Sequence, residues 1–398
     1  MSAPRPPAPG LVVFRTGAGP AVGGGHVMRC LALAGELERL GFACRFATDP
    51  GSGATVPALA GTVGFEVSGG PAAEPAALRE AWPEGVALLV ADHYHRDAGF
   101  ERACRPWAGR IAVIDDLADR PHDADLLLDP TPSRRPGEYR GLVPPACRLL
   151  LGPGYALLRS GFARAREETG RGAWPPNPPT RTVTALDPPR VMGSKGQWPL
   201  AGSGQSPGGG QGAKPPLPPC RLLVAFGATD PDNQTGQVLA GLAATGLELP
   251  VTVLLGGAAG HLEAVQATAA RLAGPARVMV DVAGPWTLLA ATDLAVGAVG
   301  TSAWERCCLG VPTVMVVADP DHHRIAAALS EAGAALAIPA GAGWPATVAA
   351  AVSRLAGDPE QRQAMAGAAL AVCDGLGAVR AAAALAALVA AALVAAAP

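Results

Sequence analysis

The sequence is poor in aromatic residues, in lysine and in net charge. Aromatic side chains make up 4% of its 398 residues, and Lys195 and Lys214 are the only lysines among 31 cationic residues. The formal net charge is −2 at pH 7. The chain therefore lacks the excess of clustered cations that holds a nucleic-acid backbone, and we expect no nucleic-acid partner.

Cysteine is present, but not in patterns that bind metals or form disulfide frameworks. The eight cysteines include no Cys-x-x-Cys pair, which argues against structural zinc and against a disulfide scaffold. The first ten residues contain no apolar run of the signal-peptide kind, so we expect a cytoplasmic protein. The tail Ala381–Pro398 is mostly alanine, and we predict a packed terminal helix there instead of a membrane span.

Nucleotide-binding fingerprints are also missing from the first glycine-rich turn. Residues 15–30 read RTGAGPAVGGGHVMRC, in which Val22 stands where the third glycine of a GxGxxG motif belongs. The turn also lacks the Gly-Lys-Ser/Thr of a P-loop. The sequence thus indicates neither a dinucleotide nor an ATP site, and we expect no cofactor.

The chain is long enough for two domains, and its composition shows where they divide. Between Gly170 and Pro219, 12 of 50 residues are proline and 10 are glycine, a density that opposes helices and sheet ladders. We predict an N-terminal domain at 11–166, a disordered insertion or linker at 167–219, a C-terminal domain at 220–375 and an alanine-rich terminal helix at 376–398.

Short apolar runs alternate with helical periodicity on both sides of this insertion. One helix follows the first strand, with an apolar face at Val27, Cys30, Leu31, Ala34 and Leu37. The predicted strands are Leu11–Phe14, Ala87–Ala91, Ile111–Ile114, Leu222–Phe226, Val251–Leu255, Arg277–Val280, Leu294–Gly297 and Thr313–Val317. The alternation predicts an α/β fold of two Rossmann-like, doubly wound parallel-sheet domains that face a central cleft.

His26 is the first candidate for chemistry. It follows three glycines and falls in the first turn of the predicted helix, where the positive end of the helix dipole favours a neutral ring that accepts a proton. A histidine that only caps the helix fits the pattern equally well.

Acidic and histidine residues at two strand ends form the second candidate. Asp92-His93-Tyr94-His95 ends one strand and Asp115-Asp116 ends the next. Their spacing matches no known ligand motif, so we favour residues that line a polar cleft over a metal site. His122 is predicted to lie in a surface loop.

The third candidate is the turn at residues 298–310. We expect Ser302 or Thr301 to cap a helix after Gly300, with free backbone N–H groups that suit a phosphate. Glu305, one turn later, is placed to accept hydrogen bonds from ribose hydroxyls, although Ser302-x-x-Glu305 also fits a capping box. Asp230 is interpreted as the cap of the next helix.

Several segments together resemble a known family, the UDP-2,4-diacetamido-2,4,6-trideoxy-β-L-altropyranose hydrolases of pseudaminic acid biosynthesis (PseG type). The likeness is collinear over most of the chain outside the insertion and the last helices. It includes Gly23-x-Gly25-His26-x-x-Arg29-Cys30-Leu31, Asp92-His93-Tyr94, Ile114-Asp115-Asp116-Leu117-Ala118, Gly154-Tyr155-Ala156-Leu157-Leu158-Arg159, Phe226-Gly227-x-Thr229-Asp230-Pro231 and Trp304-Glu305-Arg306-Cys307-Cys308-Leu309-Gly310.

The resemblance implies a GT-B-like fold and inverting hydrolysis of a UDP-sugar without a metal. It implies that His26 is the catalytic base, which activates water. The expected substrate-binding residues are Arg15, Gly25, Tyr94, Arg159, Gly227, Gly300, Thr301, Ser302, Glu305 and Asp321.

Three positions differ from the family's pattern. Gly17 stands where the family commonly has Asp, so we expect the turn to supply no helper carboxylate to His26. Ala228 replaces the second glycine of a Gly-Gly-Thr-Asp motif. Asp321-His322 stands about where an Asn-Gln pair follows the Thr313–Val317 strand, and a carboxylate cannot donate hydrogen bonds as an amide does.

The leading hypothesis is therefore a metal-independent UDP-sugar hydrolase whose partner is a small-molecule UDP-sugar. We expect no membrane partner, and the sequence does not specify an oligomer. Two alternatives remain open: a UDP-sugar-dependent glycosyltransferase of the same fold, and a non-catalytic nucleotide-sugar binding protein.

Overall fold

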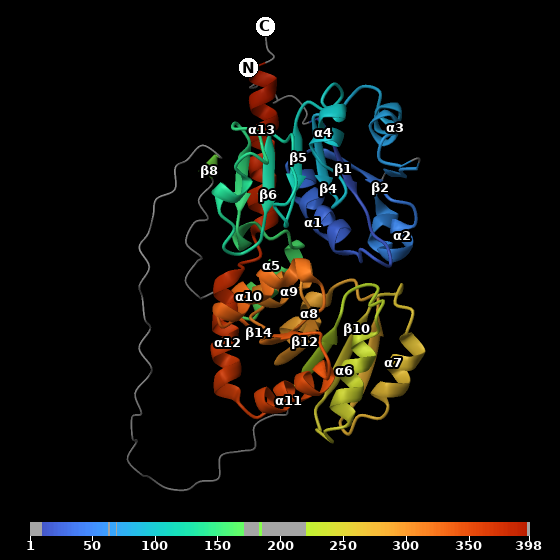
Figure 1. The fold of residues 1–398 in the computed structure, drawn as a ribbon, viewed down its shortest axis with the longest axis vertical. Helices are drawn as coiled ribbons and strands as arrows, with labels where there is room; N and C mark the ends of the chain where they lie inside the picture. The colour runs from blue at the N-terminus through green and yellow to red at the C-terminus, as the bar shows by residue number, and fades with distance from the viewer. Residues whose placement is uncertain (1–9, 63, 69, 171–182, 185–219, 396–398) are drawn as a thin grey trace, which may run out of the picture.

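Two α/β lobes lie one above the other (Figure 1). The computed structural model describes residues 10–62, 64–68, 70–170, 183–184 and 220–395. The N-terminal lobe contains one sheet of order β3-β2-β1-β4-β5-β6-β7-β8, and the C-terminal lobe contains a second of order β11-β10-β9-β12-β13-β14. The strand pairs are parallel except β7 with β8. The prediction of two Rossmann-like parallel-sheet domains is confirmed.

The N-terminal lobe alternates strands with helices and short turns. Its strands are β1 Leu11–Thr16, β2 Ala43–Thr48, β3 Gly64–Glu66, β4 Leu88–Asp92, β5 Ile111–Ile114, β6 Leu126–Asp129, β7 Arg148–Leu151 and β8 Val183–Thr184. Its helices are α1 Gly25–Arg39, α2 Ser52–Thr55, α3 Glu74–Ala81 and α4 Ala98–Cys104, with 3₁₀ turns η1 Pro57–Gly61, η2 Pro136–Tyr139 and η3 Pro153–Tyr155.

The C-terminal lobe repeats this alternation. Its strands are β9 Leu222–Ala225, β10 Val251–Leu255, β11 Ala276–Val280, β12 Leu294–Ala298, β13 Thr313–Val317 and β14 Ala335–Pro339. Its helices are α6 Gln234–Ala243, α7 Leu262–Ala269, α8 Pro285–Ala290, α9 Thr301–Cys308, α10 His323–Glu331, α11 Trp344–Ala356 and α12 Pro359–Val372, with a 3₁₀ turn η5 at Pro320–His322.

The predicted strands form because parallel strands that are covered on both faces need continuous apolar runs. β1, β4, β12 and β13 are almost completely buried, and helices cover both faces of each sheet (Figure 1). All eight predicted strands are present within two residues of the expected bounds. The apolar face predicted for α1 is confirmed, with Val27, Cys30, Ala34 and Leu37 buried in the core.

The chain crosses between the lobes at several points. Helix α5, Ser160–Glu168, belongs to the predicted N-terminal domain, but Phe162 and Ala165 pack into the core of the C-terminal lobe. After α5 has packed on the C-terminal lobe, β8 pairs with β7 in the N-terminal sheet. Helix α13, Gly377–Ala395, returns to the N-terminal lobe, where Ala381 and Leu385 pack into the core beside α1. The packing boundary therefore lies before α5 and not at residue 166.

The predicted terminal helix is α13, and it packs as expected. One stretch, Pro359–Ala392, which spans α12 and α13, is long and apolar enough to cross a membrane by length and composition, and it is partly buried inside the protein. In the predicted linker, Val183–Thr184 pairs with β7. The expectation of no regular structure is wrong at these two residues, because they lack the prolines and glycines around them and leave their backbone groups free to pair. Residues 171–182 and 185–219 lie outside the described part of the chain.

Candidate active site

The glycine-rich turn carries His26 from β1 into the first turn of α1, as predicted. Gly19 and Gly23 exchange two backbone hydrogen bonds, of 3.1 and 2.7 Å. Gly23 has φ +73°, a conformation that favours glycine. Helix α1 begins at Gly25 without a side-chain cap, so the reading of His26 as the cap of this helix is wrong. His26 is buried, with 7% of its surface exposed.

His26 is held by a carboxylate from the neighbouring strand. Its Nδ1 lies 2.6 Å from Oδ1 of Asp92, the last residue of β4. An ionised carboxylate accepts hydrogen bonds only, so this 2.6 Å contact requires the proton on Nδ1, and Arg29 NH2, 3.1 Å from the same nitrogen, donates to Asp92 Oδ1 instead. In the neutral ring Nε2 then presents its lone pair. The helper carboxylate that we expected to be missing at Gly17 is thus supplied by Asp92, because β1 and β4 are adjacent and end at the same edge of the sheet.

Arg29 holds Asp92 in its ionised form. Its Nε donates to Asp92 Oδ2 at 2.7 Å and its NH2 donates to Oδ1 at 2.6 Å, while NH1 donates to Asp116 Oδ2 at 2.9 Å. Burial opposes ionisation of Asp92, but the charge of Arg29 and the hydrogen bonds from Arg29 and His26 outweigh it and hold the pKa of the Asp92 carboxyl well below its usual range. The carboxylate therefore stays charged and keeps the ring of His26 oriented.

A small hollow lies in front of this histidine. Tyr94 meets the His26 ring edge to face, with 4.5 Å between ring centres, and burial raises the pKa of the Tyr94 hydroxyl. The hollow measures about 20 Å³, and Gly17, Val22, His26, Asp92, His93, Tyr94 and His95 line it. The hollow is large enough for about one water molecule.

Arg15 lies behind the turn and lines neither cavity. Its Nε donates to Glu74, its NH1 donates to the Thr16 carbonyl at 2.7 Å, and its NH2 donates to Asp49 Oδ1 at 2.6 Å. Its side chain is 1% exposed. The predicted substrate contact of Arg15 remains a prediction, and it would require these buried interactions to open.

The carboxylates that suggested a metal site are paired with cations instead. Asp92 and Asp116 both bind Arg29, while Asp115 lies 3.3 Å from Arg120 and 2.8 Å from the Tyr139 hydroxyl. Within the described ranges, no group of three or more His, Cys, Asp or Glu residues is arranged to hold a metal ion.

His122 is buried and not in a surface loop as expected. It is 3% exposed, and its Nδ1 lies 2.7 Å from Glu101 Oε1. Glu101 on α4 also accepts from the Asp123 N–H. The loop therefore packs under α4, a tertiary contact that its polar sequence does not reveal.

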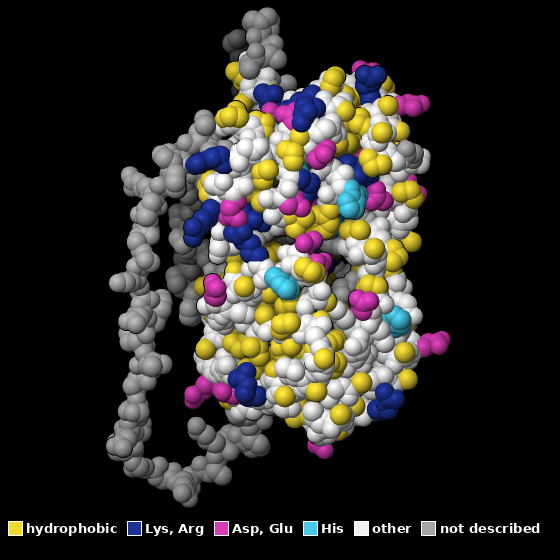
Figure 2. Space-filling model, viewed as in Figure 1, with side chains coloured by type: hydrophobic (Ala, Val, Ile, Leu, Met, Phe, Trp, Pro, Cys, Tyr) yellow, Lys and Arg dark blue, Asp and Glu magenta, His cyan; other side chains and the backbone are white. Residues whose placement is uncertain are grey.

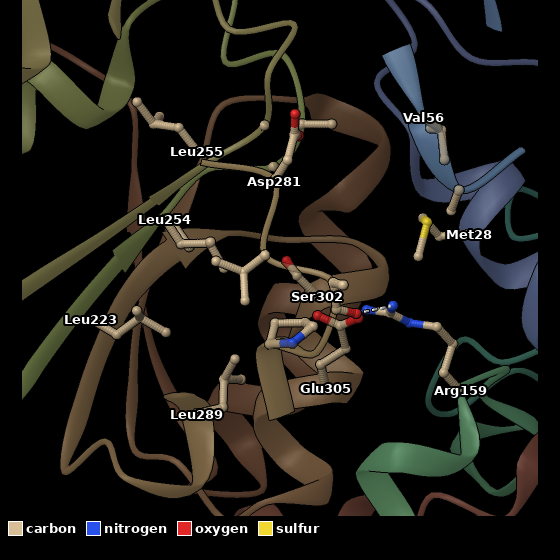
Figure 3. Close-up of a pocket in the computed structure, with 18 of the residues that line it drawn as sticks. Met28, Val56, Arg159, Leu223, Leu254, Leu255, Asp281, Leu289, Ser302 and Glu305 are labelled. Atoms are coloured by element: carbon tan, nitrogen blue, oxygen red, sulfur yellow. Dashed lines mark hydrogen bonds between the residues drawn. The ribbon is translucent and has the colours of Figure 1, made fainter. Parts of the chain in front are cut away.

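A cavity of about 340 Å³ opens between the two lobes (Figure 3). One wall comes from the C-terminal lobe and includes Leu223, Leu254 and Leu289. The opposite wall comes from the N-terminal lobe and includes Met28 on α1 and Val56 beside α2. On the face in Figure 2, acidic side chains and a histidine gather where the lobes meet.

The glycine turn and the start of α9 meet beside this cavity. A Cβ atom on Gly25 would lie 3.2 Å from Thr301 Oγ1, and one on Gly24 would lie 3.4 Å from Ala228. His26 is therefore one residue from a contact between the lobes. Gly25, Gly227 and Thr301, which the sequence picks out in distant segments, come together at this junction, and Gly227 lines the cavity.

Helix α9 begins differently from the prediction. Its N-cap is Gly300, with φ +109°, and no side chain caps the helix. Neither Thr301 nor Ser302 is the cap, and the Ser302-x-x-Glu305 capping box does not form because Ser302 is already inside the helix. The first N–H groups of α9 therefore have no side-chain partner, which is the arrangement that binds anions.

Glu305 and Arg159 point toward each other at the cavity (Figure 3). Burial raises the pKa of Glu305, and the charges of Arg159 and Arg306 oppose this shift. Arg159 donates from NH1 to the Ala283 carbonyl at 2.8 Å, and its guanidinium lies 5.0 Å from the ring centre of Trp286. Ser302, Glu305 and Arg159, all predicted, thus share one cavity.

Two further residues singled out by the sequence, Asp230 and Asp321, line neither cavity. The N-cap of α6 is Asn233 and not Asp230 as expected, although Asp230 accepts from the N–H groups of Gln234 and Thr235, the first two residues of that helix, at 2.8 and 3.0 Å. Asp321 is exposed in η5 and lines neither cavity, and its own N–H donates to Asp319. A Cβ on Gly300 would lie 3.7 Å from the ring of His322.

Sequence reasoning missed Arg29, Arg306 and Trp286 as parts of the site. Arg29 stands three residues after His26, on the same face of α1, and this spacing was the available signal. Arg306 and Trp286 are recognised as cavity residues only when α9 and α8 are placed in space.

No protein-family model matches the chain. A curated UDP-2,4-diacetamido-2,4,6-trideoxy-β-L-altropyranose hydrolase from Campylobacter jejuni subsp. jejuni serotype O:2 (strain ATCC 700819 / NCTC 11168) is 31% identical over 158 residues. The match covers 39% of this chain and 55% of that protein. The chain thus matches about half the length of this relative.

Solved structures match over nearly the whole chain at low identity. MurG of Acinetobacter baumannii has a TM-score of 0.57 at 15% identity and covers 94% of this chain and 98% of its own. The spinosyn forosaminyltransferase SpnP has a TM-score of 0.56 at 16% identity, covering 95% and 99%. UDP-GlcNAc 2-epimerase of Neisseria meningitidis has a TM-score of 0.54 at 8% identity, covering 94% and 99%. The fold is GT-B-like. The two parallel-sheet lobes support this assignment.

Proposed function

We propose that the protein hydrolyses a UDP-sugar to UDP and the free sugar, with His26 as the base that activates water. The observation that carries the proposal is the His26–Asp92 pair. Asp92 fixes the proton on Nδ1, so Nε2 offers a lone pair beside the hollow that Tyr94 borders. A histidine oriented by a carboxylate is a recurrent general base.

In the proposed reaction, Nε2 takes a proton from water while the water oxygen forms a bond to the anomeric carbon. The bond between that carbon and the diphosphate oxygen breaks, and its electron pair leaves with UDP. Attack from the face opposite the leaving group inverts the anomeric centre. The uncapped N–H groups of α9 stabilise the charge that develops on the diphosphate.

The cavity supports a nucleotide as ligand. Its apolar walls suit a base, and Glu305 provides a carboxylate that accepts hydrogen bonds from ribose hydroxyls. For the sugar, we propose 2,4-diacetamido-2,4,6-trideoxy-β-L-altropyranose. This identity is supported by the collinear motifs and by the partial match to the Campylobacter jejuni hydrolase.

The test uses the purified full-length chain and UDP-2,4-diacetamido-2,4,6-trideoxy-β-L-altropyranose, without an acceptor. We expect the wild-type protein to release equal amounts of UDP and free sugar, with the same activity in EDTA. His26→Asn should release neither product. The matched control is His261→Asn, because His261 binds the Pro231 carbonyl on the C-terminal lobe and lines neither cavity.

Other outcomes would assign a different function. UDP release that requires an added sugar acceptor would indicate a glycosyltransferase. Binding of UDP without any release would indicate a nucleotide-sugar binding protein. Activity that EDTA abolishes would contradict the metal-independent mechanism.

A further inference from the structure

Arg306 is a buried cation without an ion-pair partner in the described part of the chain. Its side chain is 3% exposed, it lines the cavity between the lobes, and its Nε has no hydrogen-bond partner. Burial lowers the pKa of Arg306 to about 10, so the guanidinium is charged at neutral pH. The charge of Glu305 acts on Arg306, but the two form no ion pair, and a buried charge that contacts no counter-charge costs stability unless a ligand supplies one.

The guanidinium is fixed beneath the first turn of α9. Its NH2 donates to the Ala298 carbonyl at 2.6 Å, at the end of β12, and its NH1 donates to Ser302 Oγ at 3.1 Å. A Cβ on Gly297 would lie 3.0 Å from NH1. The glycine therefore makes the room that the guanidinium occupies.

This contact determines what the Ser302 hydroxyl can offer. A serine hydroxyl has one hydrogen to donate, and Arg306 uses one of its acceptor positions. Among the described residues, Ser302 Oγ donates to no acceptor in the protein. Ser302 lines the cavity, so its hydrogen is available to a ligand, and the adjacent cation strengthens it as a donor.

We propose that Arg306 is a positioning residue that makes Ser302 a donor for an anionic group, the diphosphate of the nucleotide. The inference rests on the proposed function for the identity of the ligand. It places the diphosphate at the start of α9. The Ser302 hydroxyl and the free N–H groups of α9 would donate hydrogen bonds to it. The charge of Arg306 would strengthen Ser302 as a donor. Glu305, next in the chain, faces the uncharged ribose.

The experiment compares the affinities of UDP and uridine by calorimetry in five proteins: wild type, Ser302→Ala, Arg306→Met, Arg306→Lys and the Ser302→Ala/Arg306→Met double variant. We expect Arg306→Met and Ser302→Ala each to weaken UDP binding by about tenfold or more, the scale of a hydrogen bond to a charged group. Uridine binding should stay within about twofold of wild type. The double variant should lose less than the product of the two single losses, because both act on one contact.

Arg306→Lys keeps the charge and should recover part of the UDP affinity. The control is Arg271→Met, which removes an exposed arginine that lines neither cavity and should bind both ligands like wild type. Equal loss of UDP and uridine affinity in Arg306→Met, with no recovery in Arg306→Lys, would overturn the proposal and indicate a structural role. Additive losses in the double variant would also overturn it. A wild-type protein that binds neither ligand would instead refute the proposed function.

Discussion

The carboxylate of Asp49 occupies the space into which a side chain at Gly17 would extend. A Cβ atom on Gly17 would overlap this carboxylate, which accepts from Arg15 NH2 at 2.6 Å and lies 3.0 Å from His93 Nε2. His93 in turn accepts the His95 N–H at Nδ1, so its Nε2 carries the proton and donates to Asp49. The end of β2 thus supplies a carboxylate to the turn in front of His26.

Gly17→Ala should destabilise the protein by about 1–2 kcal/mol, because the methyl group must displace Asp49 from Arg15 and His93. The free energy of unfolding by urea measures this loss. In an Asp49→Ala background the same substitution should cost much less, since the obstructing carboxylate is gone. Equal costs in the two backgrounds would show that the Asp49 contact does not determine the residue at position 17.

Asp92→Asn should lower kcat for UDP release by roughly 10²–10⁴-fold, the range for a general base that loses its orienting carboxylate. The amide keeps the shape of the side chain but no longer fixes the proton on His26 Nδ1. Asp119→Asn is the control, since Asp119 is exposed and, within the described part of the chain, forms an ion pair with Arg120 alone. The melting temperature is measured alongside, because Arg29 loses one of its two carboxylates. A kcat within twofold of wild type would remove Asp92 from the mechanism.

The strands that are completely buried could be predicted from the sequence. Strands such as β4 and β13 are buried throughout and are apolar except at one end residue each, Asp92 and Thr313, so their sequence is sufficient to recognise them. Strand β2 mixes Arg45 and Thr48 with apolar residues, and it is recognisable mainly through its pairing with β1. The docking of α13 on α1 could not be predicted, because an alanine-rich face specifies no particular partner.

The candidate site could be predicted from the sequence only in part, because its residues depend on partners that only the fold brings close. Glycines at strand ends indicate where a backbone must come close to something, and they located His26 and Ser302. The pairs that tune these residues are distant in the chain: His26 and Asp92 are 66 residues apart, and Arg29 and Asp116 are 87 apart. Only the parallel order of β1, β4 and β5 brings them to one edge.

Asp129 should make the protein less stable as the pH rises toward neutral. Burial raises the pKa of its carboxyl to about 6, although Arg134 opposes the shift. Tyr139 Oη lies 2.7 Å from Asp129 and 2.8 Å from Asp115, and its single hydrogen can serve only one of them. A carboxyl whose pKa rises on folding stabilises the protein below its unfolded pKa, near 4, and this contribution is lost as the pH rises through about 6.

Asp129→Asn, which cannot ionise, should therefore gain stability relative to wild type between pH 5 and pH 7.5, on the order of 1 kcal/mol. Urea unfolding at both pH values measures the difference between the two proteins, and Asp119→Asn controls for the loss of one exposed carboxylate. A difference that does not change with pH would show that Asp129 is ionised throughout the range.

Gly161→Ala should weaken UDP binding by displacing Trp286, which contacts Arg159. A Cβ on Gly161, in the first turn of α5, would lie 2.5 Å from Cε2 of Trp286. The indole must then shift, and it supports the Arg159 guanidinium 5.0 Å from its ring centre. We expect several-fold weaker UDP binding and lower stability, although alanine is the better helix former by about 1 kcal/mol.

Gly35→Ala is the matched control, because Gly35 lies inside α1 and its Cβ position is open. It should stabilise the protein by roughly 0.5–1 kcal/mol and leave UDP binding unchanged. Calorimetry and thermal unfolding of the two variants separate the effects. If Gly161→Ala behaves like Gly35→Ala, the Trp286 contact does not position Arg159, and UDP binding does not depend on this contact.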